Sequence, residues 1–425
     1  MSSGQSRVSS VRHVFVVLLV ALAITPALMR RAHAAQVAVR GADILVDGKP
    51  FIPLGASGET RLSELKALGA NTIRTYGQEP GEILDAAQRA GLKVIVGFWL
   101  AHPRLGFNYA DRRAVTAQLE ALRHMVERYR THPALLMWGI GNEVEVELSP
   151  EEAQAVWPAI EEAARLVKTL DGQHPTMAAL AEVGQDKAAI LKRSAPSIDV
   201  LGINGYGDGL LTSAGRARAQ GWTGPIILTE LGAQGHWDAP RAPWGAPMEP
   251  TSSEKATRVR RYLMAAKQAG VGAMPFLWGQ KQEVTPSYYS LLLPTGEWTE
   301  TVEVMSDLWG GKVPGGPNRA PRILGLSLVG PARFPTDGQT LVRLSATDPD
   351  GDPLKAEWQI MAETTARSVG GDPEPVPPSF PEGLHDPAPS GVRIFGLPPG
   401  RYRVFVTLRD GRGAAATGNI PFEVQ

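Results

Sequence analysis

Leu135 to Glu143, LLMWGIGNE, is the stretch of this 425-residue sequence that decides the fold. Its apolar run is typical of a parallel strand buried on both faces, and the run stops at Asn142 and Glu143. A carboxylate at the mouth of such a strand is a candidate catalytic group, and the alternative is an ordinary solvated acid that opens the next loop. Whether Glu143 is catalytic therefore depends on the surrounding scaffold and on a second acid.

Strand-like and helix-like stretches alternate on both sides of this segment. Eight such units have the size and rhythm of a closed (β/α)₈ TIM barrel, which is predicted for residues 35–310. An open doubly wound sheet is the structural alternative, but no Gly-rich phosphate loop follows the first strand. The expected strands cover residues 51–56, 71–76, 93–100, 135–143, 176–181, 199–206, 225–231 and 271–279.

Composition changes after residue 310. Residues 311–322 are rich in Gly and Pro and are predicted to form a linker. Residues 323–425 contain short strands of period two, which is typical of a small all-β, immunoglobulin-like sandwich. The Pro-rich interval 371–389 within it is expected to be a long loop.

The acidic run DPDGDP in this sandwich presents Asp348, Asp350 and Asp352. Three carboxylates so close together suit calcium, although such a run is more often only a turn built from Asp and Gly. Together with the following Trp358, the motif resembles bacterial cadherin-like and polycystic-kidney-disease-type repeats. That resemblance implies an accessory domain without catalysis.

The N-terminus predicts the compartment. An apolar stretch from about residue 14 to residue 29 follows basic residues and precedes Ala32-His33-Ala34, a small-residue cleavage pattern. Residues 1–34 are therefore expected to be a signal peptide that exports the protein to the periplasm or beyond. An uncleaved anchor is the alternative, but Pro26 interrupts the stretch, which falls short of the roughly 20 residues that span a bilayer.

Charge and cysteine content exclude several classes of binding partner and of chemistry. Lys plus Arg and Asp plus Glu both total 43, so neither nucleic acid nor an anionic membrane is an expected partner. The absence of cysteine excludes disulfides, thiolate metal sites and a Cys nucleophile. His124, His132 and His174 show no metal-ligand spacing, so neither a metal nor a cofactor is expected.

Polar and aromatic residues gather where the expected barrel strands end, which is where the active sites of such barrels lie. Glu143 follows the fourth strand and Glu230 the seventh, which places the two acids on opposite sides of one mouth. A pair of carboxylates across a cleft is the minimum equipment for cleaving a glycosidic bond. The other candidates are substrate-binding residues, namely Arg74, Tyr76, Trp99, His102, Asn142, Asn204, Tyr206 and Trp278.

The surroundings of the two acids suggest different roles. Arg74 near Glu230 would hold that carboxylate ionised, whereas the less well paired Glu143 would keep a raised pKa and act as the acid. Trp99 and Trp278 offer apolar faces on which sugar rings can stack. His102 is expected to contact the substrate, with a merely structural role as the alternative.

These motifs resemble clan A of the glycoside hydrolases, most closely the catalytic barrels of families 2 and 5. The matching segments are NTIRTY, WGIGNE, ILTELG and PFLWG. The resemblance implies a retaining double displacement with Glu143 as acid/base and Glu230 as nucleophile, and it gives Asn142 a bond to the sugar 2-hydroxyl. It also implies that Tyr206 bonds to the nucleophile and that Arg74 supports it. Asn204-Gly205-Tyr206 departs from the His-x-Tyr of many members.

The sequence therefore predicts an exported retaining β-glycoside hydrolase, or a transglycosylase that shares its covalent intermediate. The expected substrate is a neutral β-linked oligo- or polysaccharide such as a β-glucan. The alternatives are a non-catalytic glycan-binding protein on an inherited barrel, and a surface protein whose sandwich has a structural role. The presence of both acids with Arg74 and Tyr206 favours catalysis, because binding alone would not require them.

Overall fold

The computed structural model describes residues 1, 4, 36–77, 79–365 and 371–425. The predicted signal peptide therefore lies outside the described residues, apart from Met1 and Gly4. The described part of His33–Gln425 belongs to one compact unit, and everything below concerns that unit. No helix in the described ranges is both long and apolar enough to cross a membrane.

The described chain begins with a small antiparallel sheet made of β1 (Val37–Arg40), β2 (Asp43–Val46) and β3 (Lys49–Pro50). Val37 and Ile44 of this sheet pack in one apolar cluster with Met137, Met177 and Met274, which lie near the starts of barrel strands. The sheet thus covers the N-terminal end of the barrel. The parallel strands end at the opposite, C-terminal end of the barrel, which is called the mouth below.

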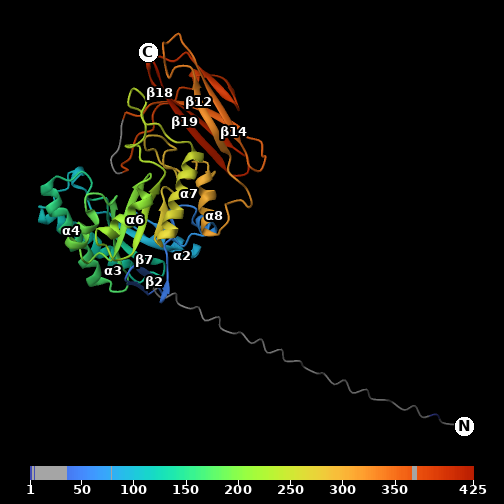
Figure 1. Cartoon of the computed structure of the whole chain (residues 1–425). Coiled ribbons are helices and arrows are strands. Elements are labelled where there is room, and N and C mark those ends of the chain that lie inside the picture. The colour runs from blue at the N-terminus through green and yellow to red at the C-terminus, as the bar shows by residue number, and fades with distance from the viewer. Residues whose placement is uncertain (2–3, 5–35, 78, 366–370) are drawn as a thin grey trace. The chain divides into compact units, whose positions relative to one another are not determined.

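Eight parallel strands form the barrel in chain order and confirm the predicted (β/α)₈ architecture (Figure 1). A parallel bridge between Leu54 and Ala273 joins the first and last strands, so the barrel is nearly closed. The observed strands are shorter than expected by at least two residues at the first, second, third and eighth positions. They are β4 (Gly55–Ser57), β5 (Thr72–Arg74), β6 (Lys93–Phe98), β7 (Leu135–Asn142), β8 (Thr176–Ala181), β9 (Val200–Tyr206), β10 (Ile226–Gly232) and β11 (Gly272–Pro275).

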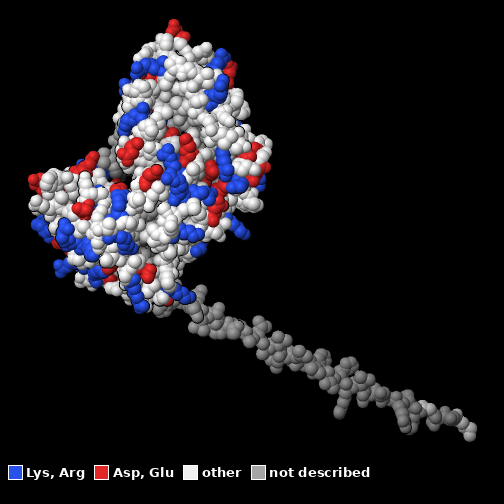
Figure 2. All heavy atoms as spheres, in the orientation of Figure 1, with Lys and Arg blue, Asp and Glu red and all other residues white. Residues whose placement is uncertain are grey.

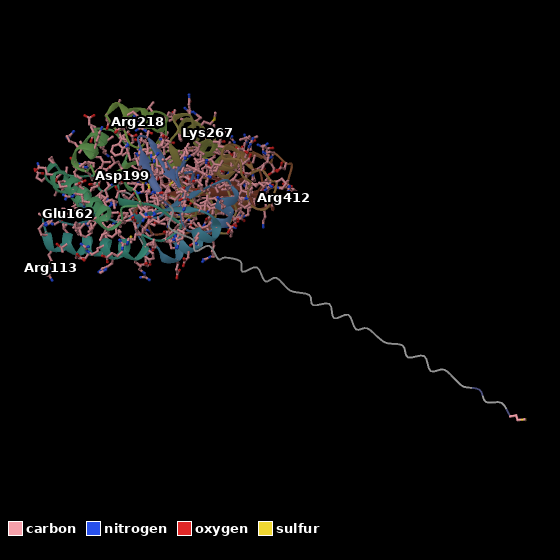
Figure 3. The ribbon with its side chains drawn as sticks, turned by 90° about the horizontal axis from the view of Figure 1, so that it is seen from below. Arg113, Glu162, Asp199, Arg218, Lys267 and Arg412 are labelled. Atoms are coloured by element: carbon pink, nitrogen blue, oxygen red, sulfur yellow. The ribbon has the colours of Figure 1, made fainter. Side chains whose placement is uncertain are left out.

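A helix follows each barrel strand. Ser149 and Thr251 begin two of these helices with reciprocal bonds to Glu152 and Glu254, which satisfy backbone amides that have no partner inside the helix. Charged side chains such as Arg113, Arg218 and Lys267 lie on the outside of the helices (Figure 3). The helices are α1 (Leu62–Ala67), α2 (Gly81–Ala90), α3 (Arg112–Tyr129), α4 (Pro150–Leu170), α5 (Lys187–Ser194), α6 (Leu210–Ala219), α7 (Ser252–Ala269) and α8 (Glu300–Trp309).

Strand β7 is buried along its whole length, as its apolar run indicates. Each large apolar side chain buried in this way stabilises the fold by about 1.5 to 3 kcal/mol. Trp138 is fully buried, and its indole nitrogen donates a 2.8 Å hydrogen bond to Asp171. His174 Nδ1 contacts the same carboxylate oxygen at 2.8 Å. This polar group connects the middle of β7 to the C-terminal end of α4.

Residues after α8 form two four-stranded sheets around a second apolar core, so the predicted β-sandwich is present. The interval 371–389 is not entirely a loop, because residues 384–388 pair with the strand Gly391–Ile394. One sheet contains β12 (Arg322–Val329), β14 (Thr340–Thr347), β17 (Gly391–Ile394) and β16 (Leu384–Ala388). The other contains β13 (Arg333–Phe334), β19 (Ala415–Val424), β18 (Gly400–Arg409) and β15 (Lys355–Ala362).

The acidic run of the sandwich brings ligand oxygens of Asp348, Asp350 and Asp352 within 4.8 Å of one another. Asp348 Oδ1 accepts the backbone amides of the other two residues, at 2.9 and 3.1 Å. Arg412 forms a 3.1 Å ion pair with Asp352. These contacts favour the turn interpretation over a dedicated calcium site.

Acidic and basic side chains are interspersed on the face of the molecule shown in Figure 2. Neither sign forms a continuous stripe on that face, which agrees with the equal numbers of the two kinds of residue.

Candidate active site

Glu230 on β10 accepts hydrogen bonds from three side chains at the barrel mouth. Its Oε1 accepts from Arg74 Nη1 at 3.1 Å and from the Tyr76 hydroxyl at 2.9 Å. Its Oε2 accepts from the Tyr206 hydroxyl at 2.6 Å. Three donors, one of them a cation, stabilise the ionised carboxylate in its buried position.

The hydroxyl groups of Tyr76 and Tyr206 act only as hydrogen-bond donors toward Glu230. Burial raises the pKa of Tyr76 well above its ordinary value, and burial followed by the charge of Glu230 does the same for the pKa of Tyr206. Both hydroxyls therefore keep their protons across the physiological pH range. The sequence placed Tyr76 among the substrate-binding residues, whereas the structure places its hydroxyl on Glu230.

Glu143 follows β7 with a backbone φ of +52°, in the left-handed region. Its Oε1 accepts a 2.7 Å hydrogen bond from Asn204 Nδ2. Burial, and then the charge of Glu230, raise the pKa of Glu143 to about 8, although the Asn204 bond acts in the opposite direction. Glu143 is therefore largely protonated at neutral pH.

A buried network of amides and Arg74 joins the two acids. Asn142 Oδ1 accepts from Arg74 Nη2 at 2.6 Å and from Asn204 Nδ2 at 3.0 Å. Thr229 donates a 2.8 Å bond to Asn204 Oδ1, which fixes the orientation of that amide. Because its oxygen is occupied, Asn142 presents its amide nitrogen as a donor. Asn204, which stands where the resembling families often have His, thus connects Glu143 with the residues around Glu230.

Trp99 and His102 form a second group after β6. Their rings stack with centroids 4.7 Å apart and an interplanar angle of 25°. Both ring nitrogens of His102 are buried, and in the described part of the chain a polar group that acts on them is the backbone of Asn142. Burial, and then the charge of Arg104, lower the pKa of His102 to about 4, so the ring is neutral. Trp99 is only half-buried, so part of its side chain remains exposed, whereas His102 is buried.

Trp278 does not occupy the position that stacking on a sugar requires. It is 1% exposed, and its indole nitrogen donates a 2.7 Å hydrogen bond to the carbonyl of Thr60. Gly58 approaches its backbone so closely that a Cβ at that position would lie 2.3 Å from the Trp278 carbonyl oxygen. Trp278 is therefore a packed side chain between β11 and the loop after β4, and the predicted stacking role is corrected.

Several aromatic side chains surround Tyr206. The sequence predicted Tyr206 as a site residue but not the rings that pack around it. Phe276 and Tyr289 have ring centroids 6.2 and 5.1 Å from that of Tyr206. Trp237 stands 5.6 Å from the same ring with 51% of its surface exposed. Trp237, on the loop after β10, therefore offers a free indole face beside the site. Tyr289 lies on the loop after β11, beyond the last motif that the sequence analysis used.

Two further acids lie near the mouth. Glu145 is buried and accepts from Lys187 at 3.1 Å and from the amide of Ala181 at 2.8 Å. Glu283 follows β11 in the segment WGQKQE and is 5% exposed. Burial raises the pKa of Glu283; the ammonium of Lys281 opposes this shift, and the charge of Glu230 adds to it. Glu283 is thus an additional carboxylate close to Glu230.

Comparisons with known proteins agree with this geometry. Residues 62–234 match the family model described as glycosyl hydrolases family 2, TIM barrel domain. A Mus musculus protein named beta-glucuronidase is 28% identical over 194 residues, which cover 40% of this chain and 27% of the mouse protein.

Solved structures share the barrel fold. The beta-D-glucuronidase of Dictyoglomus thermophilum aligns with a TM-score of 0.51 and 20% identity, covering 65% of this chain and 53% of that one. The family 2 beta-galacturonidase of Eisenbergiella tayi aligns with a TM-score of 0.51 and 17% identity, covering 65% and 54%. This chain thus matches about half of those structures, and a smaller part of the mouse protein.

Proposed function

We propose that this chain is a retaining β-glycoside hydrolase with Glu230 as nucleophile and Glu143 as acid/base, since residues 62–234 match the model of the glycosyl hydrolase family 2 TIM barrel domain. The observation that carries the proposal is the contrast between the two carboxylates. Glu230 accepts bonds from Arg74, Tyr76 and Tyr206, whereas Glu143 accepts one neutral amide bond and keeps its proton at neutral pH.

The contrast matches the first step of a double displacement. Glu143 gives its proton to the glycosidic oxygen while the Glu230 carboxylate attacks the anomeric carbon, and the leaving group departs as an alcohol. In the second step the ionised Glu143 takes a proton from water, whose oxygen attacks the same carbon and releases Glu230. A sugar hydroxyl in place of water gives transglycosylation through the same intermediate.

The substrate that we propose is a neutral β-linked sugar chain such as a β-glucan. Three cations at the mouth already have carboxylate partners, because Arg74 pairs with Glu230, Arg104 with Asp372 and Lys281 with Glu283. Paired charges suit hydroxyl groups better than a substrate carboxylate.

A β-uronide is the second candidate, because the relatives reported above are named as a glucuronidase and a galacturonidase. A uronate carboxylate would need a cation that can exchange its partner. The side chain of Lys281, at 26% exposure, is the more accessible of the two cations on the loops.

Turnover of aryl β-glycosides tests the activity and the substrate class together. The panel contains the 4-nitrophenyl β-glucoside, β-galactoside, β-glucuronide and β-galacturonide, followed by β-linked polysaccharides with product analysis. We expect Glu230→Gln to lower kcat by more than a thousandfold, while glycan binding and the melting temperature are kept. Glu120→Gln, on the exposed face of α3, is the matched control and should retain full activity.

Leaving-group dependence separates the roles of the two acids. Glu143→Gln should turn over a 2,4-dinitrophenyl glycoside far better than an alkyl glycoside, since only the poor leaving group needs a proton. If the unmodified protein binds glycans but cleaves none of the panel, it is a glycan-binding protein. If it neither binds nor cleaves them, a structural role of the sandwich takes over.

We also propose that the protein is exported, with residues 1–34 as the signal peptide, to the periplasm or the extracellular space. The basic, apolar and small-residue segments of that stretch support the proposal. N-terminal sequencing of the protein recovered from a cell fraction tests it, with a new terminus near residue 35 as the expected result. Recovery of the uncleaved chain in the cytoplasm would contradict it.

A further inference from the structure

Residues 371–374 of the sandwich contact two loops at the mouth of the barrel. Arg104, on the loop after β6, donates bonds of 2.7 and 3.2 Å to the two carboxylate oxygens of Asp372. Lys281, on the loop after β11, donates to the carbonyl of Gly371, and the amide of Val284 donates a 2.7 Å bond to Glu374. The guanidinium of Arg104 is almost completely buried by this contact.

The order of the strands shows which side of the mouth this segment occupies. The catalytic strands β7 and β10 divide the ring into one arc of β8 and β9, and a second arc of β11, β4, β5 and β6. Because residues 371–374 join the loop after β6 to the loop after β11, they reach both ends of the second arc. The contacts given above all lie on the second arc.

The segment is continuous with the residues around the two acids. Asp372 acts electrostatically on His102, the ring that stacks on Trp99. At the other end Glu374 acts on Glu283, which in turn feels the charge of Glu230. Residues 371–374 therefore act electrostatically on His102 at one end and on Glu283, a neighbour of Glu230, at the other.

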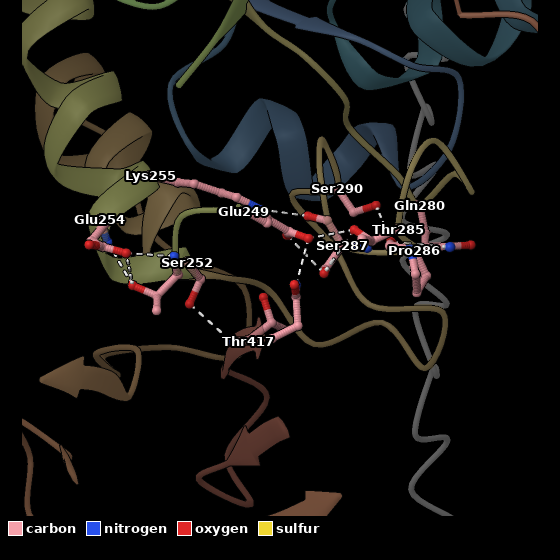
Figure 4. Close-up of polar contacts among 12 residues, drawn as sticks. Glu249, Ser252, Glu254, Lys255, Gln280, Thr285, Pro286, Ser287, Ser290 and Thr417 are labelled. Atoms are coloured by element: carbon pink, nitrogen blue, oxygen red, sulfur yellow. Dashed lines mark hydrogen bonds and ion pairs between the residues drawn. The ribbon is translucent and has the colours of Figure 1, made fainter. Parts of the chain in front are cut away.

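A second set of contacts holds the loop after β11 against the sandwich (Figure 4). Buried Glu249 accepts from Thr285 at 2.5 Å, from Ser287 at 2.9 Å and from Asn419 of β19 at 2.6 Å. Burial acts to raise the pKa of Glu249, but the charge and hydrogen bond of Lys255 outweigh it and lower that pKa. An ionised Glu249 thus ties the loop that carries Glu283 to the sandwich.

A buried arginine strengthens the same junction. Arg403 of β18 donates to both carboxylate oxygens of Glu363, at 3.0 and 2.8 Å, and to the carbonyl of Pro247 at 2.9 Å. Ser252 at the start of α7 accepts a 3.0 Å bond from the amide of Thr417. These contacts fix the position from which residues 371–374 reach the mouth.

We propose that the sandwich forms one wall of the substrate cleft through residues 371–374, with Asp372 as a specificity-determining residue. This proposal rests on the proposed glycosidase function. The wall closes the arc from β11 to β6, so a sugar chain bound between Glu143 and Glu230 extends toward the arc of β8 and β9 only.

The test compares Asp372→Ala with a matched control, Asp386→Asn, which breaks the exposed ion pair with Arg393 elsewhere in the sandwich. With the best aryl glycoside of the panel, we expect Asp372→Ala to raise KM at least fivefold while kcat changes less than twofold. The charge exchange Arg104→Asp with Asp372→Arg should restore most of the loss, and the control should change neither constant.

Binding in an inactive background makes the test independent of turnover. Calorimetric titration of the same glycoside into Glu230→Gln, with and without Asp372→Ala, should show at least a fivefold rise in Kd. Glu374→Gln repeats the test if Asp372→Ala does not fold. Unchanged KM and Kd in folded variants would contradict the proposal that residues 371–374 form a wall of the cleft. Early products of internal cleavage from a β-linked oligosaccharide would also contradict it, because the chain would then have to extend past the wall. Failure of the glycosidase proposal is recognised separately, by absence of turnover in the unmodified protein.

Discussion

The hydroxyl of Tyr206 lies 2.6 Å from Oε2 of Glu230 and donates its proton to that oxygen. The other oxygen of the same carboxylate receives Arg74 and Tyr76. Both oxygens are therefore held, and the carboxylate cannot rotate without breaking a bond to a charged group. This fixed orientation is what a nucleophile needs if it is to meet an anomeric carbon at a set angle.

Removal of the Tyr206 hydroxyl should therefore slow the reaction without unfolding the protein. A hydrogen bond to a charged group contributes about 1.5 to 3 kcal/mol, so Tyr206→Phe should lower kcat/KM by roughly ten- to a hundredfold. Tyr76→Phe should cost less, because Arg74 still holds Oε1. Steady-state kinetics and thermal melts check this, with Tyr262→Phe as control for a tyrosine–carboxylate bond to Asp208 outside the site. Equal activity of Tyr206→Phe and the unmodified protein would contradict the role.

The pH profile should report the proton on Glu143. Since the pKa of Glu143 is raised to about 8, the acid is ready to donate at neutral pH, and kcat/KM should fall as the pH rises through that value. Asn204→Ala removes the bond that lowers this pKa, so its alkaline limb should move to higher pH. A 2,4-dinitrophenyl glycoside, which needs no proton, should show a much weaker alkaline limb. An identical limb for both leaving groups would exclude Glu143 as its origin.

The two tryptophans at the mouth should respond differently to substitution. Trp237 is half exposed beside Tyr206, so Trp237→Ala should raise KM severalfold and leave the melting temperature nearly unchanged. Trp278 is fully packed, so Trp278→Phe should destabilise the fold by about 1 to 3 kcal/mol and leave KM unchanged in the folded fraction. Kinetics together with denaturant unfolding measure both effects. A large rise in KM for a stable Trp278→Phe would restore the stacking role to that residue.

The buried carboxylate of Asp171 should support stability in a pH-dependent way. Burial acts to raise the pKa of Asp171, but the bonds from His174 and Trp138 outweigh it and lower that pKa. The stabilisation is therefore present above the unfolded pKa of about 3.9 and is lost as the pH falls through the folded value.

Asp171→Asn should accordingly cost about 2 to 4 kcal/mol in the free energy of unfolding at pH 7, and less at pH 3. Urea unfolding at the two pH values measures the difference. Asp85→Asn, which removes an exposed contact with His132, is the control and should cost less than about 0.5 kcal/mol. A pH-independent loss in Asp171→Asn would show that charge is not the reason.

The barrel could be predicted because its signals are local. Buried strands such as β7 are recognisable in the sequence as continuous apolar runs. The residue that ends each run lies at the barrel mouth, even where the predicted strand length is wrong by a few residues. The strand ends therefore predict the group of Arg74, Asn142, Glu143, Asn204, Tyr206 and Glu230 from the sequence. Those side chains meet because parallel strands finish at one edge.

The parts that escaped prediction depend on contacts distant in sequence. Whether Trp278 faces the cleft or the core is decided by Thr60 and Gly58, more than two hundred residues earlier. Asp372 has no apolar pattern around it, and its place at the mouth follows only from Arg104, on a loop of the other part of the chain. The strand Leu384–Ala388 is an edge strand in a Pro-rich stretch, where propensity argues against it.

The left-handed backbone of Glu143 imposes a cost in stability on the residue that is proposed to act as the acid/base. Glycine and asparagine adopt a φ of +52° readily, whereas glutamate in this backbone conformation costs about 1 to 2 kcal/mol of conformational free energy. Glu143→Gly should therefore make the protein more stable and inactive at once. Under the proposed mechanism, this conformational cost places the acid/base carboxyl group directly after β7.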